Sequence, residues 1–339
     1  MSGSIDHSAL PRSVAIGVSS LGNFFMNEIA HMIEDGFRKL GVETRLFAEH
    51  EAWSAAGCEA VLVVAPHEFF LLGDGPIAFQ VLRRAPILVM FNTEQQQTEW
   101  FALAEQYFRR ASAILDINYQ TARYLGRSGY RAFALPLGYS DYIERTFGGH
   151  KLPEHDIFKH MPALIRNSLP AAYAERPIDI LFIGTSSARR QDFFARNASY
   201  FATKNTFIYL PDGTSPFLST ELRTIDFSAF VSIVKRSKVL LNVHRDEAPF
   251  LEWQRIVTLG ILQRTLVITD HCEPGPFIEP NVDYLDGPLA TLPELCEGAL
   301  RNPQEAEYIA HRAYTKLRTQ YPMEQILGRC WTALAKTLS

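Results

Sequence analysis

The sequence is poor in the features that would place it in several large protein classes. Its 339 residues include four cysteines, Cys58, Cys272, Cys296 and Cys330, and none has the C-x-x-C spacing of a zinc site or redox pair. Four scattered thiols do not form a disulfide framework, so we expect reduced cysteines and a cytoplasmic location. The polar N-terminus lacks the apolar core of a signal peptide, and no apolar run approaches the roughly 20 residues of a transmembrane segment.

Basic surplus and enzyme signature motifs are also lacking. Lysine and arginine number 33 against 37 acidic residues, which argues against a nucleic-acid partner. The arginine pairs at 83–84, 109–110 and 189–190 are, as such pairs usually are, most simply solvated surface. No G-x-G-x-x-G opens either half, and no Walker loop, H-E-x-x-H or G-x-S-x-G occurs. These absences weaken dehydrogenase, P-loop NTPase, zincin and α/β-hydrolase interpretations.

What the first half contains is an alternation of apolar runs and helical patterns. Apolar residues from Phe25 to Leu40 recur every three or four positions, which predicts an amphipathic helix that ends at Gly41. The runs between such helices predict strands at 13–19, 42–48, 60–65, 87–91, 113–117 and 132–137. Strands separated by helices imply right-handed crossovers and a parallel sheet, so residues 12–140 should form one Rossmann-like domain.

The second half repeats this pattern. Residues 141–176, rich in glycine, proline and histidine, predict an interdomain connection with one helix at 163–169. Residues 177–322 then predict a second doubly wound domain, with helices at 191–201 and 251–262 and a short strand at 284–285. A last helix at 323–339 is expected to pack back toward the first domain. The predicted fold class is α/β, with two Rossmann-like parallel-sheet domains.

Two candidate binding segments lie at strand ends of the second half. The first is the small-residue loop Gly184, Thr185 and Ser186 with Arg189 and Arg190 behind it, which suits a diphosphate because backbone N–H groups and a helix N-terminus favour anions. The alternative is an ordinary serine or threonine helix cap with exposed arginines.

The second segment follows the apolar run at 239–243. It contains His244 and Arg245, and Glu252 and Arg255 stand three residues apart at the start of a predicted helix. A carboxylate there could accept both hydroxyls of a ribose, while the basic side chains bind phosphate. The alternative is a surface ion pair beside a buried histidine.

Polar residues also follow strands of the first half. Gly22 and Asn23 follow the first strand, His67 follows the third and Asn92 and Glu94 follow the fourth, on the acceptor side of a predicted cleft between the domains. His67 or Glu94 could serve as the catalytic base that activates an acceptor hydroxyl. A lone histidine is more often a structural hydrogen-bonding group.

Residues 239–270 resemble the donor-binding segment of GT-B-fold glycosyltransferases of the group-1 type, especially the CgeB-like branch. They share a strand ending in L-N-x-H, a helix with Glu and Arg, and a short strand ending in V-I-T-D. The similarity extends over about 178–330. It implies two domains facing a cleft, with a nucleotide-diphospho-sugar held by Gly184 to Arg190, His244, Arg245, Glu252 and Arg255. It also implies that neither a metal nor a separate cofactor is needed.

Two departures from the family pattern stand in the same segment. Many members carry two glutamates eight residues apart, but here Glu247 has Arg255 at that spacing. The glycine often found before the final strand is replaced by Gln263 and Arg264. Either the register or the recognition of the donor therefore differs.

The resemblance therefore implies a metal-independent hexosyltransferase that acts on a nucleotide-sugar donor. The acceptor could be a small molecule, a glycan or a protein. The nucleobase, the sugar, the stereochemical outcome and the oligomeric state are left open. The alternatives are a non-catalytic nucleotide- or protein-binding descendant of the fold and a sugar-nucleotide epimerase.

Overall fold

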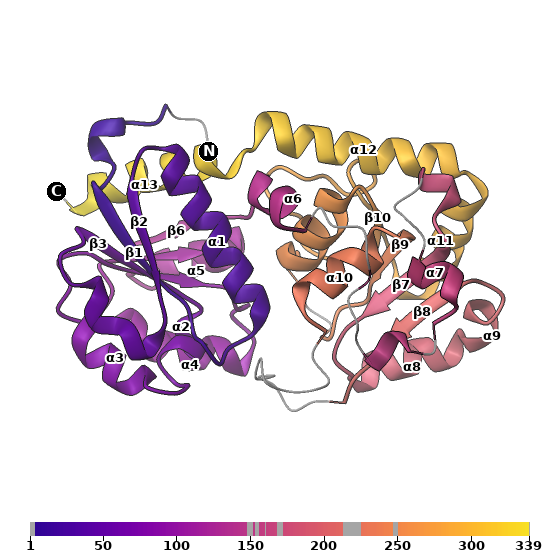
Figure 1. Ribbon diagram of the computed structural model, residues 1–339, viewed down its shortest axis with the longest axis horizontal. Helices are drawn as coiled ribbons and strands as arrows, with labels where there is room; N and C mark the ends of the chain where they lie inside the picture. Colours follow the sequence, from indigo (N-terminus) through magenta and orange to yellow (C-terminus); the bar gives the residue numbers. More distant parts are fainter. Residues whose placement is uncertain are drawn as a thin grey trace. The chain divides into compact units, whose positions relative to one another are not determined.

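The computed structural model describes residues 4–147, 152, 156–159, 161–167, 172–212, 225–246 and 250–338 (Figure 1). Two compact units divide these residues. Unit 1 holds residues 4–142 and 321–338, and unit 2 holds the described residues from 143 to 320. Each unit contains one parallel sheet with helices packed on it, which confirms the predicted α/β class with two parallel-sheet domains.

The sheet of unit 1 has six parallel strands in the order β2-β1-β3-β4-β5-β6. The strands are β1 (Ser13–Gly17), β2 (Glu43–Phe47), β3 (Ala60–Val64), β4 (Leu88–Asn92), β5 (Ala113–Asp116) and β6 (Ala132–Ala134). The helices are η1 (His7–Ala9), α1 (Phe24–Lys39), η2 (Glu49–Ala55), α2 (Pro66–Phe69), α3 (Gly75–Leu82), α4 (Glu99–Phe108), α5 (Tyr119–Arg127) and α13 (Met323–Leu338). β3 and β4 are buried along their whole length because helices cover both faces of the sheet.

Helix α1 shows how the sequence pattern becomes a packed face. Asn23 caps its first turn by accepting the Phe25 N–H at 3.0 Å. Ile29, Ile33 and Phe37 of the predicted stripe are buried. The last helix of the chain, α13, packs on α1, with the ring of Trp331 edge-on to Phe37 at a centroid distance of 5.3 Å. The final element of the chain therefore completes the core of unit 1.

The sheet of unit 2 has five parallel strands in the order β11-β10-β9-β7-β8. The strands are β7 (Ile178–Ile183), β8 (Thr206–Tyr209), β9 (Ser237–Asn242), β10 (Leu266–Asp270) and β11 (Leu285–Gly287). The helices are α6 (Asp141–Phe147), η3 (Asp156–Phe158), α7 (Ala163–Asn167), η4 (Tyr173–Glu175), α8 (Ala188–Arg196), α9 (Ala198–Phe201), α10 (Phe227–Val234), η5 (Gln254–Gly260), η6 (Ile261–Gln263), η7 (Leu289–Thr291), α11 (Leu292–Arg301) and α12 (Pro303–Gln320). α6 begins in unit 1 and ends in unit 2.

Three predicted elements of unit 2 differ in detail. The helix predicted at 191–201 begins at Ala188 and is broken at Asn197, whose side chain donates to the Phe193 carbonyl at 2.8 Å. The helix predicted at 251–262 begins at Trp253, continues as the π-helical η5 and ends as the 3₁₀ turn η6. The strand predicted at 284–285 is β11, one residue further on.

The predicted connection at 141–176 contains α6, η3, α7 and η4. α7 ends at Asn167, and residues 168–169 of the helix predicted there lie outside the described residues. Within the described part of the chain, no helix has the length and apolarity needed to cross a bilayer.

Candidate functional site

A buried polar network joins the carboxyl ends of β9 and β10 in unit 2. The Nδ1 atom of His244 lies 2.6 Å from Oδ1 of Asp270, and the same oxygen accepts the His244 backbone N–H at 2.9 Å. Nε2 of His244 faces the Asn242 amide nitrogen at 3.4 Å. With Nδ1 donating to the carboxylate, Nε2 can accept from the amide, so neighbours on both sides hold the imidazole in place.

Asp270 is a member of this network that we did not single out from the sequence. Burial alone would raise the pKa of its carboxyl, but hydrogen bonds from His244 and the charge of Arg189 outweigh burial and lower that pKa. The guanidinium of Arg189 lies 2.6 Å from Oδ2 of Asp270 and donates to the His244 carbonyl at 3.0 Å. Asp270 could have been identified from the sequence, because it stands at the end of an apolar run whose strand lies next to the strand that ends in Asn242.

Arg190 is buried and fastens the loop after β7 to the end of β9. Nε donates to the Val243 carbonyl at 2.8 Å and Nη1 to the Thr185 carbonyl at 2.8 Å. The guanidinium also lies over the Phe182 ring, 5.5 Å from its centroid. Burial lowers the pKa of Arg190 to about 10, which still leaves it charged at neutral pH.

Gly184 allows two guanidinium groups to approach this loop. A Cβ added there would lie 3.1 Å from a guanidinium nitrogen of Arg190 and 3.3 Å from one of Arg255. Arg255 is held by the Asn242 side chain, which accepts its Nη1 hydrogen at 3.0 Å. The loop backbone and two positive charges therefore share one small region.

The remaining predicted residues of this segment lie around that region. Glu252 precedes η5 and forms an ion pair with Arg255 at 3.6 Å. Burial would raise the pKa of Glu252, but Arg255, His244 and Arg190 lower it overall, so the side chain is a carboxylate. The Arg245 side chain is exposed, with no ion pair to any described residue. Glu247 lies outside the described residues.

The loop leads directly into helix α8. Ser187 caps the helix by accepting the Arg190 N–H at 3.3 Å, and Ser186 accepts from the Gln191 amide at 2.6 Å. Thr185 and Ser186 are half-buried. The positive end of a nine-residue helix is thus aimed at the loop that the arginines surround.

In unit 1, His67 and two glutamates form a second polar cluster. Nε2 of His67 lies 3.5 Å from a carboxylate oxygen of Glu94 and 3.9 Å from one of Glu68. His67 is buried, which lowers the pKa of its imidazole to about 4, so the ring is neutral at pH 7. Its Nδ1 is buried without a hydrogen-bond partner among the described residues. Glu94 is the more accessible of the two glutamates, with a side chain that is 20% exposed against 5% for Glu68.

A hydrogen-bonded pair on β4 and β5 supports the backbone of Glu94. The Asn92 amide donates to the Asp116 carboxyl at 2.7 Å and to the Glu94 carbonyl at 2.7 Å. Asp116 is completely buried, and burial raises the pKa of its carboxyl well above the ordinary value. In this structure Asn92 therefore links the end of β4 to Asp116 on β5 and to the backbone of Glu94.

Glu68 ties the first loop of unit 1 to the same cluster. Its Oε2 accepts the Asn23 N–H at 2.9 Å, and a Cβ on Gly22 would lie 2.2 Å from that oxygen. Burial raises the pKa of Glu68 to about 7. Ala65, just before the cluster, has a φ of 50°, a left-handed conformation that is uncommon for a residue other than glycine. Glu68 stands beside His67 among the polar residues after the third predicted strand, but the prediction from sequence assigns it no role.

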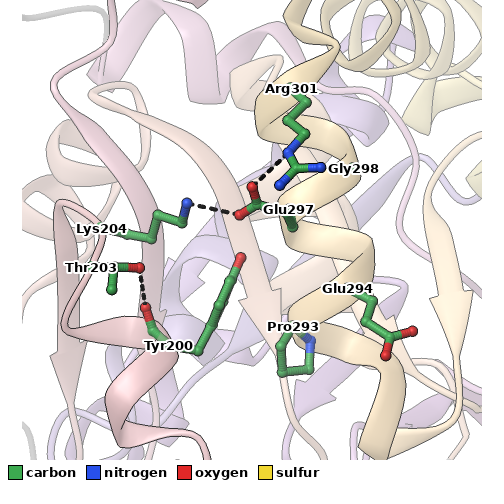
Figure 2. A pocket seen from close by; sticks show the side chains of 8 residues that line it. All are labelled: Tyr200, Thr203, Lys204, Pro293, Glu294, Glu297, Gly298 and Arg301. Carbon is green, nitrogen blue, oxygen red and sulfur yellow. Dashed lines mark hydrogen bonds and ion pairs between the residues drawn. The ribbon is translucent and has the colours of Figure 1, made fainter.

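The structure thus assembles the predicted residues into two clusters, one in each unit. No group of three or more metal-ligating side chains forms among the residues that the structure describes. A separate pocket in unit 2 lies between α9 and α11, where Glu297 pairs with Lys204 and Arg301 at 2.7 Å (Figure 2). Because both basic side chains of that pocket are already paired with Glu297, the strand-end clusters are the better candidates for function.

Solved structures share the fold of the whole chain. A sucrose-phosphate synthase from Thermosynechococcus elongatus aligns over 93% of this chain and 96% of that chain, with a TM-score of 0.60 and 12% identity. HepE from Anabaena, in complex with UDP and glucose, aligns over 97% and 99%, with a TM-score of 0.59 and 13% identity. An alpha-glucosyltransferase in complex with UDP and a 13-mer DNA with a central A:G mismatch aligns over 91% and 95%, with a TM-score of 0.53 and 11% identity.

At these identities the likeness establishes the fold alone. The chain has the GT-B glycosyltransferase fold, as the resemblance predicted. The narrower likeness to CgeB-like proteins stays a prediction. No protein-family model matches the chain, and no curated protein matches its sequence.

Proposed function

We propose that this protein is a glycosyltransferase that moves a sugar from a nucleotide-diphospho-sugar to an acceptor. The observation that carries the proposal is the cluster at the ends of β7, β9 and β10 (Figure 1). There the Gly184 loop, the N-terminus of α8 and the guanidinium groups of Arg190 and Arg255 meet. Backbone N–H groups and arginines are the groups that bind a diphosphate in proteins.

The arginines of this cluster have different proposed roles. Arg190 is buried and bonded to two carbonyl groups, so it shapes the loop and adds a fixed positive charge. Arg255 and the exposed Arg245 are the proposed contacts to phosphate oxygens, and Glu252 is the proposed ribose ligand. When the bond from sugar to phosphate breaks, its electron pair passes to the departing phosphate oxygen. Positive charge held there in advance stabilises that oxygen, which is why we propose no metal requirement.

We propose that the unit 1 cluster supplies the base for the acceptor. Glu94 is its more accessible carboxylate, and the neutral His67 ring beside it can donate one hydrogen bond to fix its orientation. The acceptor hydroxyl would form the new bond to the sugar and lose its proton to Glu94.

The test begins with ligand-induced thermal stabilisation by UDP, GDP, ADP and CDP. UDP is measured first because two of the similar solved structures contain it. A diphosphate at a hundred times its dissociation constant adds about 2.7 kcal/mol to stability. Arg255→Ala should abolish the shift, whereas Arg196→Ala, at the far end of α8, should retain it.

Product analysis then separates the function classes. With the bound nucleotide sugar and a mixture of acceptors, the native protein should yield a glycosylated product. Glu94→Gln should bind the diphosphate normally and lose about a hundredfold or more in transfer rate. A changed sugar with no acceptor would favour an epimerase, and binding without turnover a non-catalytic protein. No shift with any diphosphate would refute the donor site.

A further inference from the structure

Three large apolar side chains project into solvent from two adjoining elements of unit 1. Trp53 on η2 is 72% exposed, and Ile77 and Val81 on α3 are 66% and 43% exposed. The other flank of α3 carries Phe79, which packs on Tyr107 of α4. Ile77 and Val81 therefore lie on the flank opposite Phe79, on a helix that adjoins η2. We call Trp53, Ile77 and Val81 the apolar flank.

A set of arginines follows the C-terminal ends of α3 and α4. Arg83 and Arg84 follow α3, and Arg109 and Arg110 follow α4. The two pairs are placed near one another because the rings of Phe79 and Tyr107, at the same ends of the two helices, lie 4.9 Å apart. Two more arginines stand at the end of α5 and the start of β6. The basic edge is defined as Arg83, Arg84, Arg109, Arg110, Arg127 and Arg131.

The basic edge is continuous, and among the described residues Glu105, which stands on α4 one turn before Arg109, forms no ion pair with it. Tyr130, next to Arg131, packs on Phe108, next to Arg109, with centroids 6.2 Å apart. All six arginines are exposed, and none of their side chains forms an ion pair or hydrogen bond with a described residue. The acids Glu43 and Glu59 at this edge of the sheet lie by Arg12, at its other side.

Helix dipoles account for only part of this arrangement. A helix C-terminus favours a basic residue in its last turn, which explains one arginine at each helix end. It does not explain paired arginines after two adjacent helices, nor tryptophan, isoleucine and valine exposed beside them. Exposed apolar side chains rimmed by charge mark an interaction surface.

We propose that the apolar flank and the basic edge together dock unit 1 on a bilayer surface that carries anionic lipid. Arginines attract anionic headgroups, while tryptophan and aliphatic side chains enter the boundary between headgroups and acyl chains. Isoleucine and valine offer nothing to a nucleic-acid backbone, which argues against that polyanion. A symmetric contact with a second copy would set the arginines against themselves. The inference does not depend on the proposed sugar transfer.

The experiment measures binding to vesicles of phosphatidylcholine alone and of phosphatidylcholine with 30% phosphatidylglycerol. We expect flotation with the anionic vesicles only, and loss of binding in high salt because the charges are exposed. Trp53 should report the contact most strongly, since it is 72% exposed, whereas Trp100 is half-buried and Trp253 and Trp331 are only 1% and 2% exposed. Tryptophan emission should therefore shift to the blue on binding, and Trp53→Phe should remove most of that shift.

Substitutions measure the contributions of the basic edge and of the apolar flank separately. Only variants that unfold at the same temperature as the native protein are compared. Replacing Arg83, Arg84, Arg109 and Arg110 by glutamine should lower partitioning about a hundredfold or more. Ile77→Ser with Val81→Ser should weaken binding at constant charge, while Arg166→Gln on α7 should leave it unchanged. The proposal fails if the native protein ignores anionic vesicles, if it binds duplex DNA of equal charge more tightly, or if the arginine variants bind as the native protein does. Concentration-dependent dimerisation lost in the serine variants would also overturn it.

Discussion

Glu68 shows how a single buried side chain can link loops that are distant in sequence. Its carboxyl holds the Asn23 N–H, lies against Gly22 and faces His67 at 3.9 Å. Burial raises the pKa of Glu68 to about 7, so the folded protein retains a proton that the unfolded chain releases near its ordinary pKa of 4.5. Between these two pH values the native state binds more protons than the unfolded state, and stability falls as pH rises.

Glu68→Gln should remove this dependence. Relative to the native protein, the variant should gain up to about 3 kcal/mol of unfolding free energy between pH 5 and pH 8. His67, whose pKa is lowered to about 4, makes stability rise with pH over its own titration range. Because it does so in the native protein and in the variant alike, the difference in stability between the two keeps its sign. Urea unfolding at the two pH values measures the effect, and Glu99→Gln on the exposed start of α4 is the control. A difference that stays constant with pH would show that Glu68 titrates normally.

At this scale the sequence was informative about which residues meet and less so about their roles. Residues at strand ends, such as His244 and Arg255, could be grouped because parallel strands bring their carboxyl ends together. Whether an arginine faces solvent or a carbonyl depends on side-chain packing that no local pattern encodes. Arg190 and Arg189 look alike in sequence, yet only Arg190 is buried against Phe182.

At the scale of elements, the helical segment η5–η6 is positioned by one close contact with β10. A Cβ on Gly260 would lie 2.1 Å from a methyl group of Val267. Val267 is buried in the strand and has few alternative rotamers, so it cannot move aside at low cost. The same segment carries Arg255 about one turn earlier, where its guanidinium donates to the Asn242 side chain at the end of β9.

Gly260→Ala should therefore lower the unfolding free energy by about 1–3 kcal/mol through overpacking. Gly298→Ala is the matched control, because a Cβ there meets nothing within 4 Å and helix propensity favours alanine by up to about 1 kcal/mol. Thermal unfolding of the two variants beside the native protein gives the comparison. Equal midpoints for both variants would contradict the contact.

Strands and long helices could be predicted at this scale because hydrophobic periodicity reflects burial directly. The π-helical form of η5 and the break at Asn197 could not, since each depends on hydrogen bonds between particular backbone groups. Arg264 gives another example. It is one of the two residues, with Gln263, that stand where the family resemblance leads us to expect glycine, and its φ of 54° is the left-handed conformation that glycine adopts readily. Its guanidinium lies over the Tyr314 ring at 4.2 Å, a contact that glycine could not provide.

At the scale of the whole molecule, two units with separate cores share one chain. The core of unit 1 depends on α13, in which Trp331 is 2% exposed, and the core of unit 2 is built from residues between 143 and 320. Separate cores allow separate responses to substitution. Alternating strands and helices predict two such sheets; that the last helix packs back toward the first domain is a separate expectation, and α13 packs on α1 of unit 1.

Trp331→Ala should destabilise unit 1 by about 3–5 kcal/mol and leave unit 2 close to native stability. Hydrogen exchange followed by mass spectrometry should show faster exchange in peptides of α1 and β1 and unchanged exchange in β9 and β10. Trp53→Ala, at an exposed position, should change neither set. Equal loss of protection in both units would mean that they unfold as one cooperative body.

The return of α13 to unit 1 has a consequence for biosynthesis. The strands of unit 1 leave the ribosome first, but the helix that covers Phe37 is made only after all of unit 2. Unit 2 can therefore close while the first sheet still exposes an apolar face, which is the interval in which a nascent chain is most prone to aggregate. The order of completion is the reverse of the order of synthesis.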